Sequence, residues 1–215
     1  MPINLKEFAE PGRTALLIHE MQEGVVGKSV PGPLRQLADV VEQRGVAEHL
    51  AKLLKAARRS GVKVFHCPAF SRGDNLGSMT NTPLHNAIKK LGPRDFDTTS
   101  ASAASVPGLE PRPGEWTIWR SHAMTAFHDT SLDSLCRNMG IGTIVVTGVS
   151  LNCGVVGVTI EGINRAYRVV VPTDCVAGFP AEYGDMVLKH CLSGLSFLTT
   201  ARDLSAAWGI SWSEL

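Results

Sequence analysis

The sequence lacks both a long apolar run and an excess of charge of either sign. No stretch reaches the roughly 18 apolar residues that a membrane-spanning helix requires. Lysine and arginine together number 21 against 20 acidic residues, which gives a formal net charge of +1. A protein that binds nucleic acid generally carries a basic excess or a basic cluster, and this chain has neither. We therefore predict that its partners include neither a membrane nor a nucleic acid.

Cysteine is sparse as well. The chain has five cysteines, an odd number, and no two of them form a CxxC pair. This pattern argues against a disulfide framework and against a zinc ribbon. Residues 1–7 show no basic segment followed by an apolar one, so no signal peptide is predicted. The expected location is therefore the cytoplasm, and we predict no cofactor.

Short apolar runs alternate with loops and helical stretches along the chain. The predicted strands cover residues 14–18, 62–67, 116–119, 143–147, 168–171 and 196–199, and the predicted helices cover 46–60, 83–91, 130–138, 154–166 and 181–192. Because the strands are continuously apolar, they are typical of parallel strands covered on both faces. Residues 1–215 are thus predicted to form a single α/β domain, a Rossmann-like three-layer α/β/α sandwich around a mostly parallel sheet of about six strands. Ligands of such sheets bind at the carboxyl ends of the strands.

Three segments resemble the isochorismatase-like (cysteine hydrolase) superfamily. Residues 15–22 read Ala-Leu-Leu-Ile-His-Glu-Met-Gln, similar to an opening strand that ends in Asp-Met-Gln. Residues 125–132 resemble the Ser-Ala-Phe-x-x-Thr-x-Leu segment, and residues 140–177 resemble the Gly-Ile-x-Thr-x-Val-Val-x-Gly-Val-x-x-Asn stretch with its following helix and strand. The resemblance implies an isochorismatase-like fold, a small-molecule substrate and a homo-oligomer, either a dimer or a tetramer. It also implies a cis peptide between Val149 and Ser150.

Most members of this superfamily hydrolyse C–N bonds with an Asp–Lys–Cys triad, and this chain departs from it at all three positions. Glu20 stands at the aspartate position and places its carboxylate one methylene further out. Ser121 stands at the lysine position, between Arg120 and His122. Gly154 stands at the cysteine position. Cys153 precedes it by one residue, which on a helix is about 100° of rotation.

Some members of the superfamily cleave a vinyl ether instead, with a carboxylic acid and a water molecule but no thiolate. We therefore predict a hydrolase that acts on a small carbonyl- or carboxylate-bearing molecule by non-covalent acid/base chemistry at Glu20. As a general acid, Glu20 would need a pKa raised by burial. The predicted catalytic residues are Glu20, Arg120 and His122, and the predicted substrate-binding residues are Phe127, Asn152, Cys153 and Gly154.

Several alternatives remain open at this point. A local shift of the loop would make Cys153 the nucleophile of an amidase, and loss of the whole triad would fit a catalytically silent binding or subunit-interaction relative. Glu20 would then be a structural carboxylate paired with Arg120. His19 is interpreted as a core histidine, and Asn152 as a cap of the following helix. The cysteine and histidine that end the second predicted strand lack the Asp-x-His spacing of metal-binding relatives, so no metal site is predicted.

Overall fold

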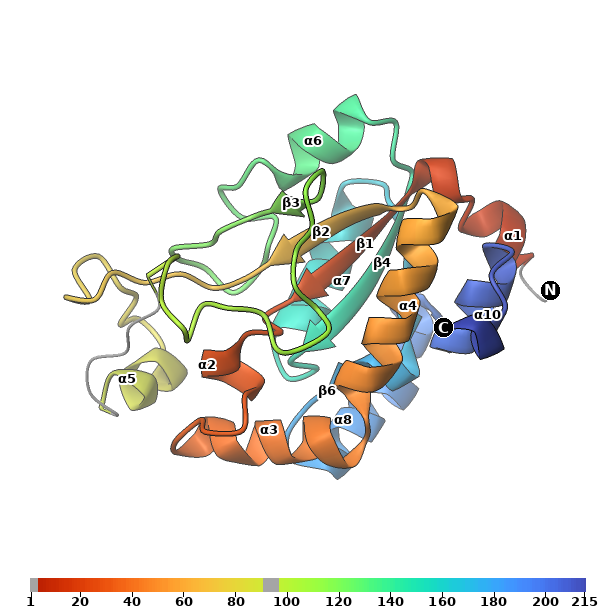
Figure 1. The fold of residues 1–215 in the computed structure, drawn as a ribbon. Coiled ribbons are helices and arrows are strands. Elements are labelled where there is room, and N and C mark those ends of the chain that lie inside the picture. Colours follow the sequence, from red (N-terminus) through yellow and green to blue (C-terminus); the bar gives the residue numbers. More distant parts are fainter. Residues whose placement is uncertain (1–3, 91–96) are drawn as a thin grey trace.

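A parallel β-sheet forms the centre of the computed structural model, which describes residues 4–90 and 97–215 (Figure 1). The strands follow the order β3-β2-β1-β4-β5-β7, and β6 pairs with the end of β4. Their bounds are β1 Thr14–His19, β2 Lys63–Cys67, β3 Trp116–Thr117, β4 Thr143–Val149, β5 Arg168–Pro172, β6 Val176–Ala177 and β7 Phe197–Thr199. Within the described ranges the sheet therefore has seven strands, one more than the sequence predicted, because the two-residue β6 carries no recognisable apolar run.

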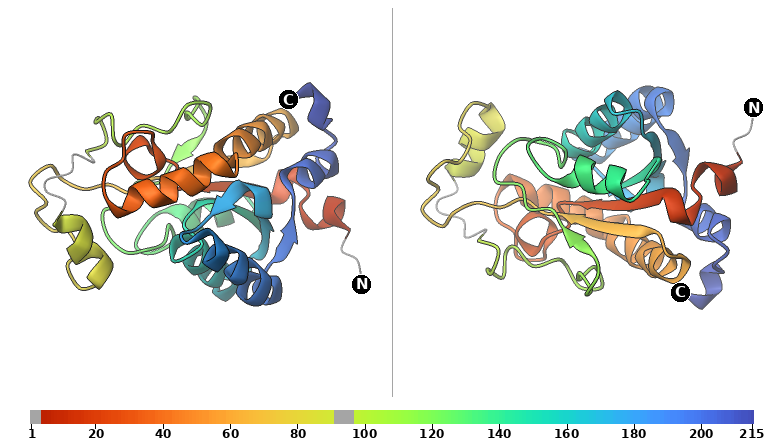
Figure 2. Two further views of the ribbon diagram at one scale, coloured as in Figure 1. Left: turned by 90° about the horizontal axis from the view of Figure 1, so that it is seen from below. Right: turned by 90° about the horizontal axis from the view of Figure 1, so that it is seen from above.

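Helices cover both faces of the sheet and confirm the three-layer α/β/α sandwich. Figure 2 shows α3 (Pro33–Gln43) and α4 (Val46–Ser60) on one face and α7 (Gly154–Asn164) on the other. The side chains of β1 alternate between two separate hydrophobic clusters, with Leu16 in one and Leu17 in the other. Every residue of β1 and β4 is buried, which explains why these strands are apolar without alternation. The remaining helices are α1 Leu5–Phe8, α2 Glu23–Val26, α5 Pro83–Lys89, α6 Leu132–Asn138, α8 Ala181–Val187, α9 Ser193–Leu195 and α10 Ala201–Ala207.

Helix α4 agrees residue for residue with its prediction. Leu50, Leu53 and Leu54 lie on one face of the helix and are fully buried. Gly61 ends the helix at a φ of +83°, where its N–H reaches the carbonyl of Ala57. This left-handed conformation carries no steric cost for glycine, which explains the sharp end of the helix.

Other predicted boundaries were wrong. The helix expected over 130–138 begins at Leu132, because the Thr130 hydroxyl donates to the Ala126 carbonyl and accepts from the Leu132 N–H instead of capping from position 130. The helix expected over 181–192 is regular only to Val187 and continues as a π-helical turn over 188–192. The strand expected over 116–119 covers only 116–117, and the sequence did not predict α3 or α10. The helix expected over 83–91 ends at Lys89, and residue 91 lies outside the described residues.

The carboxyl ends of β1, β2 and β4 meet at one edge of the sheet. His19, the last residue of β1, is in register with Cys67 and Gly148. A Cβ atom on Gly148 would lie 2.1 Å from the His19 carbonyl oxygen. The close approach of the β1 and β4 backbones at this point therefore requires glycine at position 148. Among the described helices, none has the length and apolarity needed to cross a bilayer.

Candidate active site

A cavity of about 400 Å³ lies at this edge of the sheet. Val25 of α2, Leu37 of α3 and Ile88 of α5 contribute to its apolar lining. Its polar lining includes Glu20, Arg120, Ser121, His122, Ser150, Asn152, Cys153 and Gly154. The fold therefore brings all the predicted site residues except Phe127 to one cavity.

Glu20 and Arg120 form an ion pair in this cavity. Glu20 directly follows β1, at a φ of +52°, and its carboxylate accepts a hydrogen bond from Nη2 of Arg120. Burial, the largest influence, acts to raise the pKa of Glu20, but its neighbours, with Arg120 foremost, together hold that pKa below the ordinary value. Glu20 is therefore a carboxylate at neutral pH, and the expectation that burial raises its pKa for a general acid was wrong.

His19 is the second partner of Arg120. Its Nδ1 lies 2.7 Å from the Val149 carbonyl oxygen, and its Nε2 lies 2.9 Å from Nη1 of Arg120. A carbonyl only accepts and a guanidinium only donates, so His19 is a neutral imidazole with its proton on Nδ1. Burial, the largest influence, lowers the pKa of His19, in agreement with this assignment.

The interpretation of His19 as a core histidine agrees with its burial, at 1% exposed, and with its two partners. The sequence did not predict its contact with the guanidinium that holds Glu20. Strand alternation would place the two side chains on opposite sides. Alternation stops at Glu20, however, because this residue adopts the left-handed conformation, and Arg120 bridges the two side chains.

The His19 imidazole fills the space next to Gly154. A Cβ atom on Gly154 would lie 2.4 Å from Cε1 of His19 and 2.8 Å from its Nδ1. No side chain fits at position 154 unless His19 moves. The space beside the Gly154 backbone is therefore closed by a histidine 135 residues earlier in the chain, a relation that no local sequence pattern reveals.

Cys153 and Asn152 precede α7, after a cis peptide between Val149 and Ser150 as the resemblance implied. The Cys153 thiol is half-buried, and both its burial and the charge of Glu20 raise its pKa, which disfavours the thiolate. The Asn152 amide does not cap α7, so that interpretation was wrong. It binds the backbone of Phe179 instead, donating to its carbonyl at 2.5 Å and accepting from its N–H at 2.9 Å.

His122 and Phe127 lie on the segment between β3 and α6. His122 lines the cavity with a side chain that is 44% exposed, and its Nε2 is 3.4 Å from the Asp129 carboxylate. Phe127 is buried, its ring stacks on Tyr167 at 5.9 Å between centroids, and it is not among the residues that line the cavity. The prediction that Phe127 binds substrate is therefore corrected: it is a core residue. The sequence also missed His85 of α5, which lines the cavity.

Comparison with known proteins shows the class to which this fold and site belong. Residues 14–203 match the isochorismatase domain. The chain is 31% identical over 183 residues to the ureidoacrylate amidohydrolase RutB of Methylorubrum extorquens, covering 78% of this chain and 72% of RutB. It is 29% identical over 179 residues to the isochorismatase family protein YwoC of Bacillus subtilis, covering 82% and 84% of the two chains.

Solved structures show the same fold. A cysteine hydrolase from Pseudomonas syringae pv. phaseolicola superposes with a TM-score of 0.77 at 21% identity, over 94% of this chain and 95% of that one. An isochorismatase family protein from Burkholderia thailandensis superposes with a TM-score of 0.73 at 26% identity, over 92% and 96%. The protein belongs to the isochorismatase family, and by that membership it is an isochorismatase-family hydrolase.

Proposed function

We propose that this protein hydrolyses a small carbonyl- or carboxylate-bearing molecule by non-covalent acid/base chemistry at Glu20. One observation carries the proposal: an ionised carboxylate, paired with Arg120, faces a cavity that Gly154 also lines, and the His19 imidazole fills the space where a side chain at position 154 would begin. The carboxylate can accept a proton, and no side chain at position 154 can form a covalent intermediate.

In the proposed reaction a water molecule is the nucleophile. Glu20 takes one of its protons while the water oxygen bonds to the electrophilic carbon of the substrate. The C–N or C–O bond then breaks, and the leaving group takes the proton back from Glu20. Each cycle consumes one water and leaves Glu20 ionised, in keeping with its lowered pKa.

Arg120 and the start of α7 are the groups suited to hold the oxygen atoms of the substrate. A guanidinium has five N–H groups, more than its contacts with Glu20 and His19 use. In the part of the chain that the structure describes, no hydrogen bond has the Gly154 N–H as its donor, and this N–H belongs to the first residue of α7. Backbone N–H groups at a helix N-terminus bind anionic oxygen well.

The cavity indicates the size and polarity of the substrate. About 400 Å³ suits a small molecule, with an apolar part against α2, α3 and α5 and a polar group against Glu20 and Arg120. RutB, a relative at 31% identity, is an amidohydrolase of ureidoacrylate. Amides of small carboxylic acids are therefore the first substrates to test, and enol ethers, whose cleavage needs an acid rather than a base, are the contrasting class.

A second mechanism would use Cys153 as the nucleophile, since its thiol lines the same cavity. Its raised pKa disfavours this mechanism. We therefore prefer the non-covalent reaction and expect Cys153 to contact substrate without forming a bond to it.

The decisive experiment measures turnover of a panel of small amides, ureido acids and enol ethers. We expect Glu20→Gln to lower kcat/KM by about 10²-fold or more, the range typical of losing a general base. Cys153→Ala and treatment with a thiol alkylator should change it by less than about 3-fold. Glu48→Gln and Cys191→Ala, outside the cavity, are the matched controls.

Two results would contradict the proposal. If Cys153→Ala abolishes turnover and the alkylator labels Cys153, the protein is a cysteine amidase. If the panel yields ligands that raise the melting temperature but no product, the protein is a catalytically silent binding relative.

A further inference from the structure

Three potential metal ligands meet beside the cavity, on the segment between β3 and α6. Nε2 of His122 lies 3.4 Å from Oδ2 of Asp129, and Nε2 of His128 lies 3.5 Å from the same oxygen. One ligand atom from each of the three residues lies within 4.8 Å of the other two. Two imidazoles thus approach one carboxylate oxygen, with their rings nearly perpendicular and their centroids 5.7 Å apart.

These distances are compatible with a transition-metal ion held between the three side chains. Four ligands at about 2.0–2.1 Å from a tetrahedral zinc ion are about 3.3 Å from one another. Two nitrogens at 3.4 and 3.5 Å from one oxygen have nearly this spacing, whereas a charge-assisted N–H···O bond is usually about 2.7–2.9 Å long. Imidazole and carboxylate are also the donors that zinc and similar divalent metals accept.

The orientation of His122 suits the same role. Its Nδ1 lies 3.1 Å from the Ser121 hydroxyl oxygen, so the hydroxyl can accept the Nδ1 proton and leave the Nε2 lone pair free. Metal-binding histidines usually have such a partner on the second ring nitrogen, because it selects the tautomer that can ligate.

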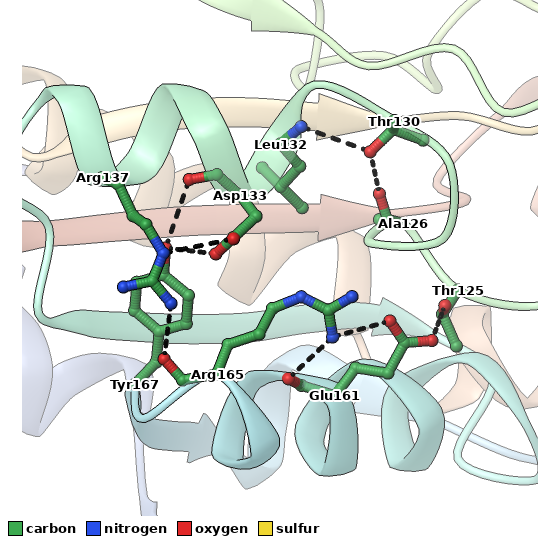
Figure 3. Close-up of polar contacts among 9 residues, drawn as sticks. All are labelled: Thr125, Ala126, Thr130, Leu132, Asp133, Arg137, Glu161, Arg165 and Tyr167. Carbon is green, nitrogen blue, oxygen red and sulfur yellow. Dashed lines mark hydrogen bonds and ion pairs between the residues drawn. The ribbon is translucent and has the colours of Figure 1, made fainter.

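The segment that carries the ligands is held in place on both sides of His128 and Asp129. Figure 3 shows Thr125 bonded to Glu161 of α7 on one side, and Thr130 bonded to the Ala126 carbonyl and to the N–H of Leu132 on the other. Figure 3 also shows that Glu161 pairs with Arg165. His128 and Asp129 therefore extend from a turn anchored to α6 and α7, which lowers the entropy cost of bringing these two ligands to an ion.

We propose that His122, His128 and Asp129 form a binding site for one divalent transition-metal ion of the zinc type. Three protein ligands leave at least one coordination position for water or for a substrate oxygen, the arrangement found in catalytic rather than structural zinc sites. Since His122 also lines the cavity, the bound ion stands at the edge of the cavity. The proposal does not depend on the reaction proposed for Glu20, because it concerns binding alone.

The test is a titration of the chelator-treated protein with Zn²⁺ and Co²⁺ by calorimetry and visible absorption. We expect one ion per chain and a rise in melting temperature on binding. His128→Ala and Asp129→Asn should each lower the affinity for the ion by at least about 10²-fold. Mutating even a residue that only hydrogen-bonds to a metal ligand typically lowers metal affinity by about 10- to 100-fold. Both side chains are more than half exposed, so both variants should fold.

Matched controls separate this site from adventitious binding. His190→Ala removes an exposed histidine elsewhere, and Cys153→Ala removes the thiol that lines the cavity. Both should bind one ion with unchanged affinity. The proposal fails if the wild-type chain binds no stoichiometric ion, or if His128→Ala and Asp129→Asn bind as tightly as the wild type.

Discussion

At the scale of single residues, the position of the His19 side chain determines which residue fits at position 154. The imidazole is fixed by the Val149 carbonyl on one side and by Arg120 on the other, so it cannot easily rotate away. It therefore occupies the space that a Cβ atom at position 154 would need. The two residues are therefore coupled sterically, even though they lie far apart in the chain.

We expect Gly154→Ala to destabilise the protein by about 1–3 kcal/mol, the usual cost of overpacking a buried site. In a His19→Val background the same substitution should cost at least about 1 kcal/mol less, because the clashing ring is gone. Urea unfolding of the four proteins of this double-mutant cycle measures the coupling.

Gly194→Ala is the control for this cycle, because nothing lies within 4 Å of a Cβ atom at that position. Its cost should be small and should be the same with either residue at position 19. Strictly additive effects of Gly154→Ala and His19→Val would show that the imidazole does not close position 154.

At the scale of elements, a partly buried ion pair joins α4 and β2 to the turn before β3. The carboxylate of Glu115 accepts hydrogen bonds from Arg58 of α4 at 2.6 and 3.0 Å and lies 3.0 Å from Nε2 of His66. The Arg112 N–H also donates to it, at 2.9 Å. Burial acts to raise the pKa of Glu115, but these partners together lower it to about 2.

This pair should make stability depend on pH. The folded-state pKa of Glu115 lies below the ordinary value, so its stabilisation is complete above about pH 4.5 and is lost as the pH falls toward 2. Glu115→Gln should lower the free energy of unfolding by about 2 kcal/mol near pH 7 and by progressively less below pH 4.5. Unfolding of both proteins in urea at several pH values measures this difference.

Glu48→Gln, on an exposed side chain of the same helix α4, is the control and should have almost no effect at any of these pH values. A difference between Glu115→Gln and the wild type that stays constant from about pH 7 to about pH 3 would show that the carboxylate does not titrate as expected.

At the scale of the whole molecule, α7 and α9 expose large apolar side chains. Ile160, Ile163 and Leu195 are large exposed side chains there, and α7 contacts α9. Exposed apolar groups gathered in this way are typical of an interaction surface. The homo-oligomer predicted from the sequence remains a prediction, and this surface is where we expect its interface.

We expect the double variant Ile160→Lys/Ile163→Lys to shift the protein toward the monomer, because two buried lysines at an interface would be unpaired charges. Sedimentation velocity of this variant and of the wild type measures the shift. Trp116→Lys, on the exposed tryptophan of β3 at the other edge of the sheet, serves as a control and should leave the oligomer intact. A monomeric wild type, or dissociation caused by Trp116→Lys alone, would contradict the assignment.

The sequence alone determined the layered α/β fold and the edge of the sheet at which the site lies. Both follow from local properties: continuous apolar strands such as residues 143–147 must be covered on both faces, and amphipathic helices such as residues 46–60 cover them. Glu20 and Gly154 could be located because each directly follows or begins such an element. The start of α6 could not be predicted from the sequence. The Thr130 hydroxyl donates a hydrogen bond to the Ala126 carbonyl instead of capping the helix from position 130.

Only the tertiary structure decided how the residues of the candidate site contact one another. The lowered pKa of Glu20, the tautomer of His19 and the closed space at Gly154 all depend on Arg120, which lies about a hundred residues from Glu20. The structure likewise placed Phe127 in the core and brought His122 to His128 and Asp129. Charges and close contacts act through space between elements that are distant in the chain, and the local patterns of a sequence carry no record of those distances.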